Sequence, residues 1–257
     1  MNSIRNGIGM RKRRSRRNQA DRGIRIPMRF SPKFITRSSS LYKALLFDLD
    51  GTLAETDSLH LPTWVDVLAP YGVEVDEEFY KQSISGLSTG EVVRALLPDL
   101  DDEEGRSIGD TKEASCRERA SELEPLPGLV DFVEQGRERG MRVALVTNAP
   151  EQNVEAILLA LELRDFFDTV VLADEVEAVK PDPAPYEVAL RKIGVAAEEA
   201  IAFEDSVSGI SSSVAAGVPT VGITSSQNPR RLLDAGAFMT AKDFTDKQLQ
   251  ALIRTPG

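Results

Sequence analysis

The stretch FDLDGTL, residues 47–53, places two aspartates and a glycine directly after the apolar run at residues 41–47. Such a run is typical of a strand that is buried in a parallel sheet. Asp48 and Asp50 lie two residues apart on an extended segment and therefore point to the same side, and Gly51 lets the backbone turn sharply behind them. The pair can share a metal ion and divide nucleophilic and acid/base work. The same pattern also occurs in calcium-binding loops and ordinary turns, so the pair alone leaves both interpretations open.

Three further polar elements follow later apolar segments that have the composition of strands. They are Thr147-Asn148 after residues 143–146, Lys180-Pro181 after residues 170–172, and Glu204-Asp205 after residues 200–203. In an open parallel sheet the functional site lies at the carboxyl ends of the strands. The ordered set is therefore expected to meet at one edge of the sheet.

In this order the four motifs resemble those of the haloacid dehalogenase superfamily, and the resemblance extends from about residue 41 to the end of the chain. It implies an α/β fold, with a Rossmann-like parallel sheet core and an inserted all-helical cap domain. It also implies a phosphoric monoester hydrolase that uses Mg²⁺. The segment EDSVSG, residues 204–209, resembles the branch that contains β-phosphoglucomutase and small sugar-phosphate phosphatases.

The resemblance implies covalent catalysis. Asp48 would attack phosphorus to form an aspartyl-phosphate, and Asp50 would protonate the leaving oxygen and then activate water. Lys180 would supply positive charge to the site. Thr147 would hold the transferring phosphoryl group and, with Asn148, bind the substrate.

The same resemblance implies a set of metal ligands. Mg²⁺ prefers hard oxygen ligands and keeps room for water and for a phosphate oxygen. The implied ligands are Asp48, the backbone carbonyl of Asp50, Glu204 and Asp205.

Each motif also has a structural explanation that involves no catalysis. Lys180 taken alone can be a solvated surface lysine. Thr147 and Asn148 can cap the helix that follows them. Glu204 and Asp205 can form the charged start of a helix, which the helix dipole favours. The order of the motifs along the chain favours the catalytic interpretation.

Hydrophobic periodicity predicts a helical insertion in an alternating α/β chain. No strand pattern appears between Glu55 and Glu124, so residues 56–124 are predicted as the cap domain, and residues 41–55 and 125–257 as the core domain. The cap helices are expected at residues 57–71, 76–84, 88–97 and 103–123, the last with a possible break at Gly109. The alternation after Gly128 predicts a parallel sheet with right-handed crossovers.

Two polar residues of the predicted cap are candidate substrate ligands. His60 is the only histidine and stands ten residues after Asp50. Its counterpart in sugar-phosphate members of the family faces the site, so it can contact the substrate or assist proton transfer. A surface or packed imidazole is the structural alternative. Ser88, which also begins a capping-box pattern, is the second candidate.

Phosphatase activity is favoured over isomerase activity. The resembling mutases place basic cap residues that grip a second phosphate, where this chain has Ser85 and Thr89. Thr52 is also commoner in phosphatases, and the presence of Asp50 argues against dehalogenase activity. The prediction is a Mg²⁺-dependent phosphatase acting on a small phosphate monoester, in particular a sugar phosphate. A phosphosugar mutase is the alternative, followed by a binding module that has lost catalysis.

The first 40 residues differ from the rest in charge. They hold twelve of the 31 Lys and Arg residues and one of the 41 acidic residues, although the whole chain has a net charge of −10. A segment of this kind cannot pack a core and is expected to be disordered. Its interpretations are a plastid or mitochondrial transit peptide, a nucleic-acid-binding arm, or a start codon assigned upstream of a true beginning near Met28.

Composition sets the remaining expectations. The 257 residues, 41% of them apolar, suffice for an α/β core and a small accessory domain. No apolar run reaches the roughly 18 residues needed to cross a bilayer, and the one cysteine, Cys116, excludes an intramolecular disulfide. A cytoplasmic, monomeric enzyme with a small-molecule partner, and without membrane or nucleic-acid partners, is therefore expected.

Overall fold

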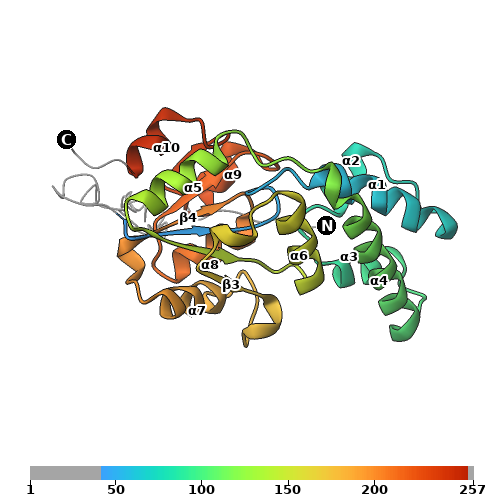
Figure 1. The fold of residues 1–257 in the computed structure, drawn as a ribbon. Coiled ribbons are helices and arrows are strands. Elements are labelled where there is room, and N and C mark those ends of the chain that lie inside the picture. The colour runs from blue at the N-terminus through green and yellow to red at the C-terminus, as the bar shows by residue number, and fades with distance from the viewer. Residues whose placement is uncertain (1–41, 254–257) are drawn as a thin grey trace, which may run out of the picture. The chain divides into compact units, whose positions relative to one another are not determined.

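The centre of the protein is a six-stranded parallel sheet, seen in a computed structural model that describes residues 42–253 (Figure 1). The strands lie in the order β3-β2-β1-β4-β5-β6. They are β1 (Ala44–Phe47), β2 (Arg142–Val146), β3 (Thr169–Val171), β4 (Ala200–Glu204), β5 (Thr220–Ile223) and β6 (Met239–Ala241). The first strand is central, with Phe47 opposite Leu145 of β2 and Phe203 of β4. The predicted α/β fold with a parallel sheet is confirmed.

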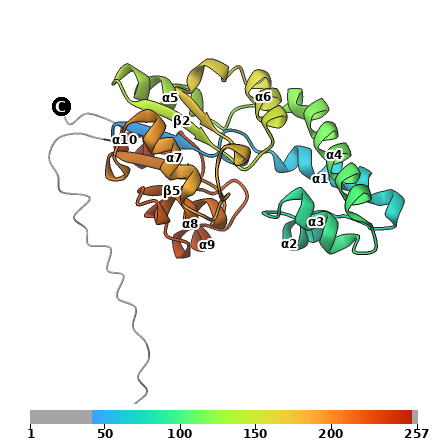
Figure 2. The same ribbon diagram turned by 90° about the horizontal axis from the view of Figure 1, so that it is seen from below.

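Side chains of β1 alternate between the two faces of the sheet, as the pleat of a strand requires. Leu45 and Phe47 pack on the face covered by α5 (Leu129–Glu138), α6 (Glu151–Ala160) and α10 (Lys247–Leu252). Ala44 and Leu46 pack on the other face, which α7 (Ala184–Ile193) covers. The helices α8 (Val207–Ala215) and α9 (Pro229–Asp234) pack together beside α7, as Figure 2 shows. Both faces of the sheet are therefore buried.

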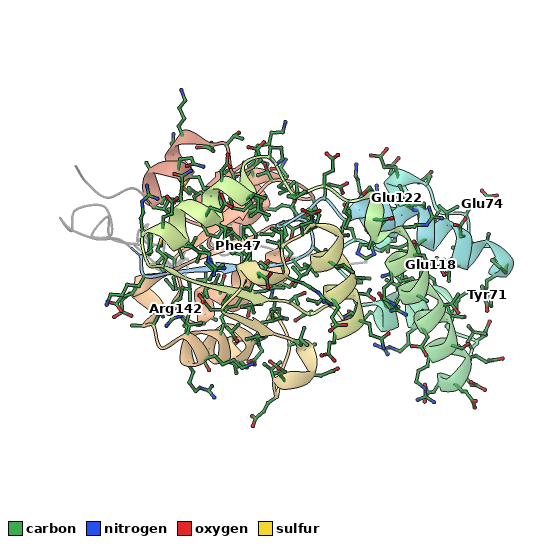
Figure 3. The ribbon with its side chains drawn as sticks, in the orientation of Figure 1. Phe47, Tyr71, Glu74, Glu118, Glu122 and Arg142 are labelled. Atoms are coloured by element: carbon green, nitrogen blue, oxygen red, sulfur yellow. The ribbon has the colours of Figure 1, made fainter. Side chains whose placement is uncertain are left out.

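The chain between β1 and α5 is helical, and we refer to it as the α1–α4 segment. Its helices are α1 (Asp57–Leu68), α2 (Glu77–Ser83), α3 (Thr89–Leu96) and α4 (Asp102–Arg119). A second apolar cluster around Trp64, Tyr80 and Val92 holds them together. The segment lies at one end of the sheet in both ribbon views, and Figure 3 places Tyr71 and Glu74 at its outer end, far from Phe47. The described residues form one compact unit, so a separate cap domain stays a prediction.

Several local predictions can be compared with the observed elements. The break at Gly109 is wrong, because α4 continues through it with Gly109 close to Thr89 of α3. The last helix, α10, was not predicted; it has only six residues and begins at the side-chain cap Asp246. The capping box at Ser88 and Glu91 is confirmed.

Short 3-10 turns complete the described chain, at Ala69–Tyr71, Ala120–Glu122, Arg164–Phe166, Ala173–Glu175 and Ala197–Glu199. Among the described residues, no helix combines the length and the apolar character that crossing a membrane requires. The predicted basic tail at residues 1–40 lies outside the described residues.

Candidate functional site

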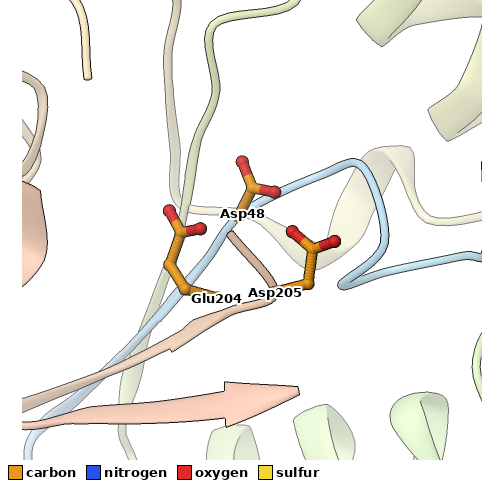
Figure 4. Close-up of side chains that lie close together, drawn as sticks. All are labelled: Asp48, Glu204 and Asp205. Atoms are coloured by element: carbon orange, nitrogen blue, oxygen red, sulfur yellow. The ribbon is translucent and has the colours of Figure 1, made fainter. Parts of the chain in front are cut away.

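Three carboxylates meet at the carboxyl end of the two central strands. Asp48 follows β1, Glu204 ends β4, and Asp205 comes next; the register that pairs Phe47 with Phe203 brings them to the same level of the sheet. One oxygen of each lies within 4.8 Å of the others, and Figure 4 shows the three side chains around one small space. Their residues are 7%, 0% and 7% exposed. The structure therefore brings together three of the predicted site residues in a buried cluster.

Lys180 is the cation of this cluster. Its Nζ donates to Asp48 Oδ1 at 2.6 Å, to Glu204 Oε1 at 2.6 Å and to the Val146 carbonyl at 2.7 Å. The residue is 6% exposed, so the interpretation as a solvated lysine is wrong. Asn148 holds the loop in place, because its side chain accepts from the Lys180 amide at 3.2 Å and donates to the Lys180 carbonyl at 3.3 Å.

Glu204 is fixed in place by Tyr186, which the sequence did not single out, and by the close approach of Gly209. The Tyr186 hydroxyl, fully buried on α7, donates to Glu204 Oε1 at 2.6 Å. On the other side, a Cβ on Gly209 would lie only 1.9 Å from Glu204 Oε2. Glu204 therefore occupies the space that a side chain at position 209 would need. No sequence signal identifies Tyr186, because its spacing in α7 is that of an ordinary core residue.

Replacing Gly209 with Ala is expected to displace Glu204 and to lower the free energy of unfolding by about 3 kcal/mol, the cost of overpacking against a rigid group. Thermal or urea unfolding measures the loss. The control is Gly90→Ala on α3, where the nearest atom to the added Cβ is the flexible Arg94 side chain at 3.4 Å. We expect that change to be neutral or slightly stabilising, since alanine favours helix. Equal stability of the two variants would contradict the packing described here.

The carboxylate cluster carries more negative charge than Lys180 offsets. Burial, followed by the charge of Glu204, raises the pKa of Asp48 to about 8 although Lys180 acts in the opposite direction. Burial and the charge of Asp48 likewise raise the pKa of Asp205 well above its ordinary value. A divalent cation would relieve this repulsion, and hard carboxylate oxygens suit Mg²⁺. The donor set therefore fits the predicted metal.

Asp50 lies outside the carboxylate cluster and faces His60 of α1. The distance from His60 Nε2 to Asp50 Oδ1 is 3.5 Å, and the other ring nitrogen, Nδ1, lies 3.3 Å from the Cys116 thiol of α4. The His60 side chain is 21% exposed, so the interpretation as a surface imidazole is wrong. Burial acts to lower the pKa of His60, but Asp50 and Cys116 raise it to about 9. Burial acts to raise the pKa of Asp50, but His60, together with Thr56 and Lys112, lowers it.

The His60–Asp50 contact predicts a pH-dependent stability. A histidine whose pKa rises from 6.5 to about 9 on folding stabilises the protein below pH 6.5, and this stabilisation is lost as the pH rises through about 9. The metal-free wild type is therefore expected to exceed His60→Asn in unfolding free energy at about pH 6 and to match it near pH 10. Urea unfolding in EDTA across this range measures the difference. A gap that does not change with pH would contradict the ion pair.

The remaining predicted site residues are distributed around this centre. Thr147 is buried, and its Oγ1 accepts from the Ala149 amide at 3.0 Å. The residue at the N-cap of α6 is Pro150, so the interpretation of Thr147 and Asn148 as a helix cap is wrong. Ser206 is the N-cap of α8, and its hydroxyl accepts from the Gly209 amide. Glu204 and Asp205 precede this cap, so they do not belong to the first turn of the helix.

One cavity connects the site with the α1–α4 segment. Its volume is about 1510 Å³, and its lining includes Asp48, Asp50, His60, Ser88 and Thr147. The Ser88 hydroxyl is engaged in capping α3, where it contacts the Glu91 amide and carboxylate. All candidate residues except Glu204 therefore reach this cavity: Asp48, Asp50, His60, Ser88, Thr147, Asn148, Lys180 and Asp205.

Basic side chains of the α1–α4 segment also line the cavity. These residues were not predicted, because only Ser85 and Thr89 were compared with the basic residues of mutases. They are Arg94, Arg106, Lys112 and Arg117. Lys112 is buried and pairs with Glu113 at 3.0 Å. Glu113 also accepts from Thr89 and Asn153, and Asn153 accepts from Arg117 at 2.8 Å. This network joins α4 to α6 beside the motif at Thr147.

Comparison with known proteins gives consistent similarities. Residues 45–223 match the family model described as haloacid dehalogenase-like hydrolase. The chain is 30% identical over 206 residues to a phosphorylated carbohydrates phosphatase of Thermotoga maritima, covering 78% of this chain and 94% of the relative. It is 33% identical over 187 residues to the fructose-1-phosphate phosphatase YqaB of Escherichia coli, covering 71% and 96%.

A solved structure extends the similarity to the fold. The crystal structure of CbbY from Rhodobacter sphaeroides in complex with phosphate aligns with a TM-score of 0.71 at 28% identity. The alignment covers 80% of this chain and 96% of that chain.

Proposed function

This chain belongs to the haloacid dehalogenase-like hydrolases, and we propose that it is a Mg²⁺-dependent phosphatase that hydrolyses a small sugar phosphate through a phosphorylated Asp48. The observation that carries the proposal is the position of Asp48. Its carboxylate stands in a buried cluster with Glu204 and Asp205, 2.6 Å from the Lys180 ammonium, at the wall of a large cavity. A nucleophile needs such a setting to approach a phosphate dianion.

The residues that would hold Mg²⁺ are Asp48, Asp205, Glu204 and the backbone carbonyl of Asp50. When bound, the ion would offset the charge of the carboxylates and of the phosphate oxygens. Lys180 adds a fixed positive charge at the same place. Tyr186 and Gly209 support the assignment, because they fix the Glu204 carboxylate in one position.

The proposed reaction has two steps. In the first, an Asp48 oxygen forms a bond to phosphorus, the ester P–O bond breaks, and Asp50 donates a proton to the leaving sugar oxygen. In the second, Asp50 takes a proton from water, the water oxygen bonds to phosphorus, and the bond to Asp48 breaks. His60 contacts Asp50 from α1 and so restrains the carboxyl that moves the proton. Thr147 and neighbouring amides bind the phosphoryl oxygens.

The cavity and the relatives support a sugar phosphate as the substrate class. The α1–α4 segment, proposed as a cap domain at residues 56–124, gives the cavity a polar wall with His60, Thr89, Lys112 and Glu113. Donors and acceptors of this kind suit the hydroxyl groups of a sugar. Two relatives, a phosphorylated carbohydrates phosphatase and a fructose-1-phosphate phosphatase, support the same class. Closure of the segment over the site would exclude bulk water and so strengthen the electrostatic interactions with the phosphoryl group.

A substrate panel tests the proposed function. Release of inorganic phosphate is measured with p-nitrophenyl phosphate and with pentose, hexose and bisphosphate sugars, each with Mg²⁺ or EDTA. We expect Mg²⁺-dependent release and a higher kcat/KM for one group of sugar phosphates. Transfer of phosphate within a hexose phosphate, without release, would identify a mutase. No turnover of any ester would leave a binding module and contradict the proposal.

A further inference from the structure

Two serines that follow β5 contact the predicted metal site, although neither is one of the proposed metal ligands. The Ser225 hydroxyl donates to the Gly51 carbonyl at 2.5 Å, and the Ser226 hydroxyl donates to Asp205 Oδ2. Both serines line the cavity. They reach the site because β5 lies beside β4, with Gly222 opposite Glu204, so the chain that leaves β5 passes next to Asp205.

Gly51, Asp205 and Ser225 are packed closely against one another. Gly51 has a φ of +70°, which favours glycine, and a Cβ at this position would lie 2.1 Å from Asp205 Oδ2 and 3.1 Å from Ser225 Oγ. Gly51 also directly follows Asp50, whose carbonyl is a proposed metal ligand. Each serine therefore lies next to one proposed ligand. Ser226 bonds the Asp205 carboxylate directly, and Ser225 bonds the residue that follows the Asp50 carbonyl.

We propose that Ser225 and Ser226 are positioning residues for the metal, a pair that we name the serine clamp. This inference rests on the proposed Mg²⁺-dependent function. Ser226 fixes the rotation of the Asp205 carboxylate by occupying Oδ2, which leaves Oδ1 for the metal. Ser225 restrains the Gly51 carbonyl, and with it the backbone that presents the Asp50 carbonyl. Hydrogen bonds to metal ligands from outside the ligand set commonly change metal affinity 10- to 100-fold.

Mg²⁺ binding measured by isothermal titration calorimetry tests the clamp independently of turnover. Ser226→Ala is expected to raise the Kd for Mg²⁺ by about 10-fold, while kcat at saturating Mg²⁺ stays within about 2-fold of wild type. Ser226→Thr keeps a hydroxyl and should restore most of the affinity. Ser225→Ala should also weaken Mg²⁺ binding, and the double variant should weaken it most.

Ser211→Ala is the matched control. Its hydroxyl donates to the Val207 carbonyl on α8, away from the cavity, so Mg²⁺ affinity should not change. Wild-type affinity in both Ser226→Ala and Ser225→Ala, with the wild type binding Mg²⁺, would overturn the clamp and leave the proposed function intact. If the wild type itself binds no Mg²⁺, both are overturned. Loss of affinity in Ser211→Ala to the same extent would also overturn the clamp, because the effect would then be general.

Discussion

Replacing Asp48 with Asn is expected to reduce turnover of every phosphate ester by more than about 1000-fold, a typical cost of removing a nucleophile. The amide is a poor nucleophile and cannot supply an anionic ligand to the metal. Release of inorganic phosphate under single-turnover conditions measures the loss. The closely similar volume of Asn keeps the packing around β1 unchanged.

The fold of Asp48→Asn is expected to remain stable. Burial and the neighbouring Glu204 charge raise the pKa of Asp48, so the charged form is disfavoured in the folded protein and its replacement relieves repulsion. A melting temperature close to that of the wild type, measured in EDTA, would separate loss of chemistry from loss of structure. A variant that keeps more than about one hundredth of the wild-type rate would contradict nucleophilic catalysis by Asp48.

Replacing Lys180 with Met is expected to impair stability and activity together. The change leaves Asp48 and Glu204 buried without their cation, and breaking a buried ion pair in this way typically costs about 3 kcal/mol or more. The loss of a fixed charge beside the phosphoryl group should also reduce the rate by about 1000-fold. Urea unfolding and phosphate release measure the two effects, and added Mg²⁺ should recover part of the stability.

The matched control for this change is Lys192→Met. Lys192 pairs with Glu175 at 2.6 Å, the same distance as in the buried pairs, but both side chains are about 40% exposed. An exposed pair contributes less than about 1 kcal/mol, so we expect little change in stability or rate. If Lys180→Met behaved like Lys192→Met, the buried cluster would not have the role assigned to it.

The sheet was predictable because its strands combine apolar runs with polar residues at their carboxyl ends. The segments expected at residues 143–146, 170–172 and 200–203 match β2, β3 and β4 to within one residue at each end, since each is an apolar run. The helix α10 was not predicted because its six residues are too few to show a helical periodicity, and only the cap Asp246 marks its start. At Gly109, helix packing against Thr89 outweighs the weak helix propensity of glycine.

The site was predictable to the extent that its residues follow strands. Asp48, Lys180, Glu204 and Asp205 come together because parallel strands end at one edge of the sheet. Side chains that act through them were not predictable, because they come from helix interiors and loops far away in the sequence. Tyr186 and the serine clamp at Ser225 and Ser226 belong to this group. Their contacts depend on tertiary packing, which a local sequence pattern does not reveal.

Trapping the covalent intermediate tests the central claim most directly. The variant Asp50→Asn is incubated with p-nitrophenyl phosphate, whose leaving group departs without a proton, and the reaction is stopped in acid. Because the amide introduced at position 50 cannot activate water, the phosphorylated enzyme should accumulate, and peptide mass spectrometry should find the phosphoryl group on Asp48. The same experiment with Asp48→Asn should yield no phosphorylated peptide. Release of p-nitrophenol by Asp50→Asn without phosphorylation of Asp48, at any time after mixing, would contradict covalent catalysis by this residue.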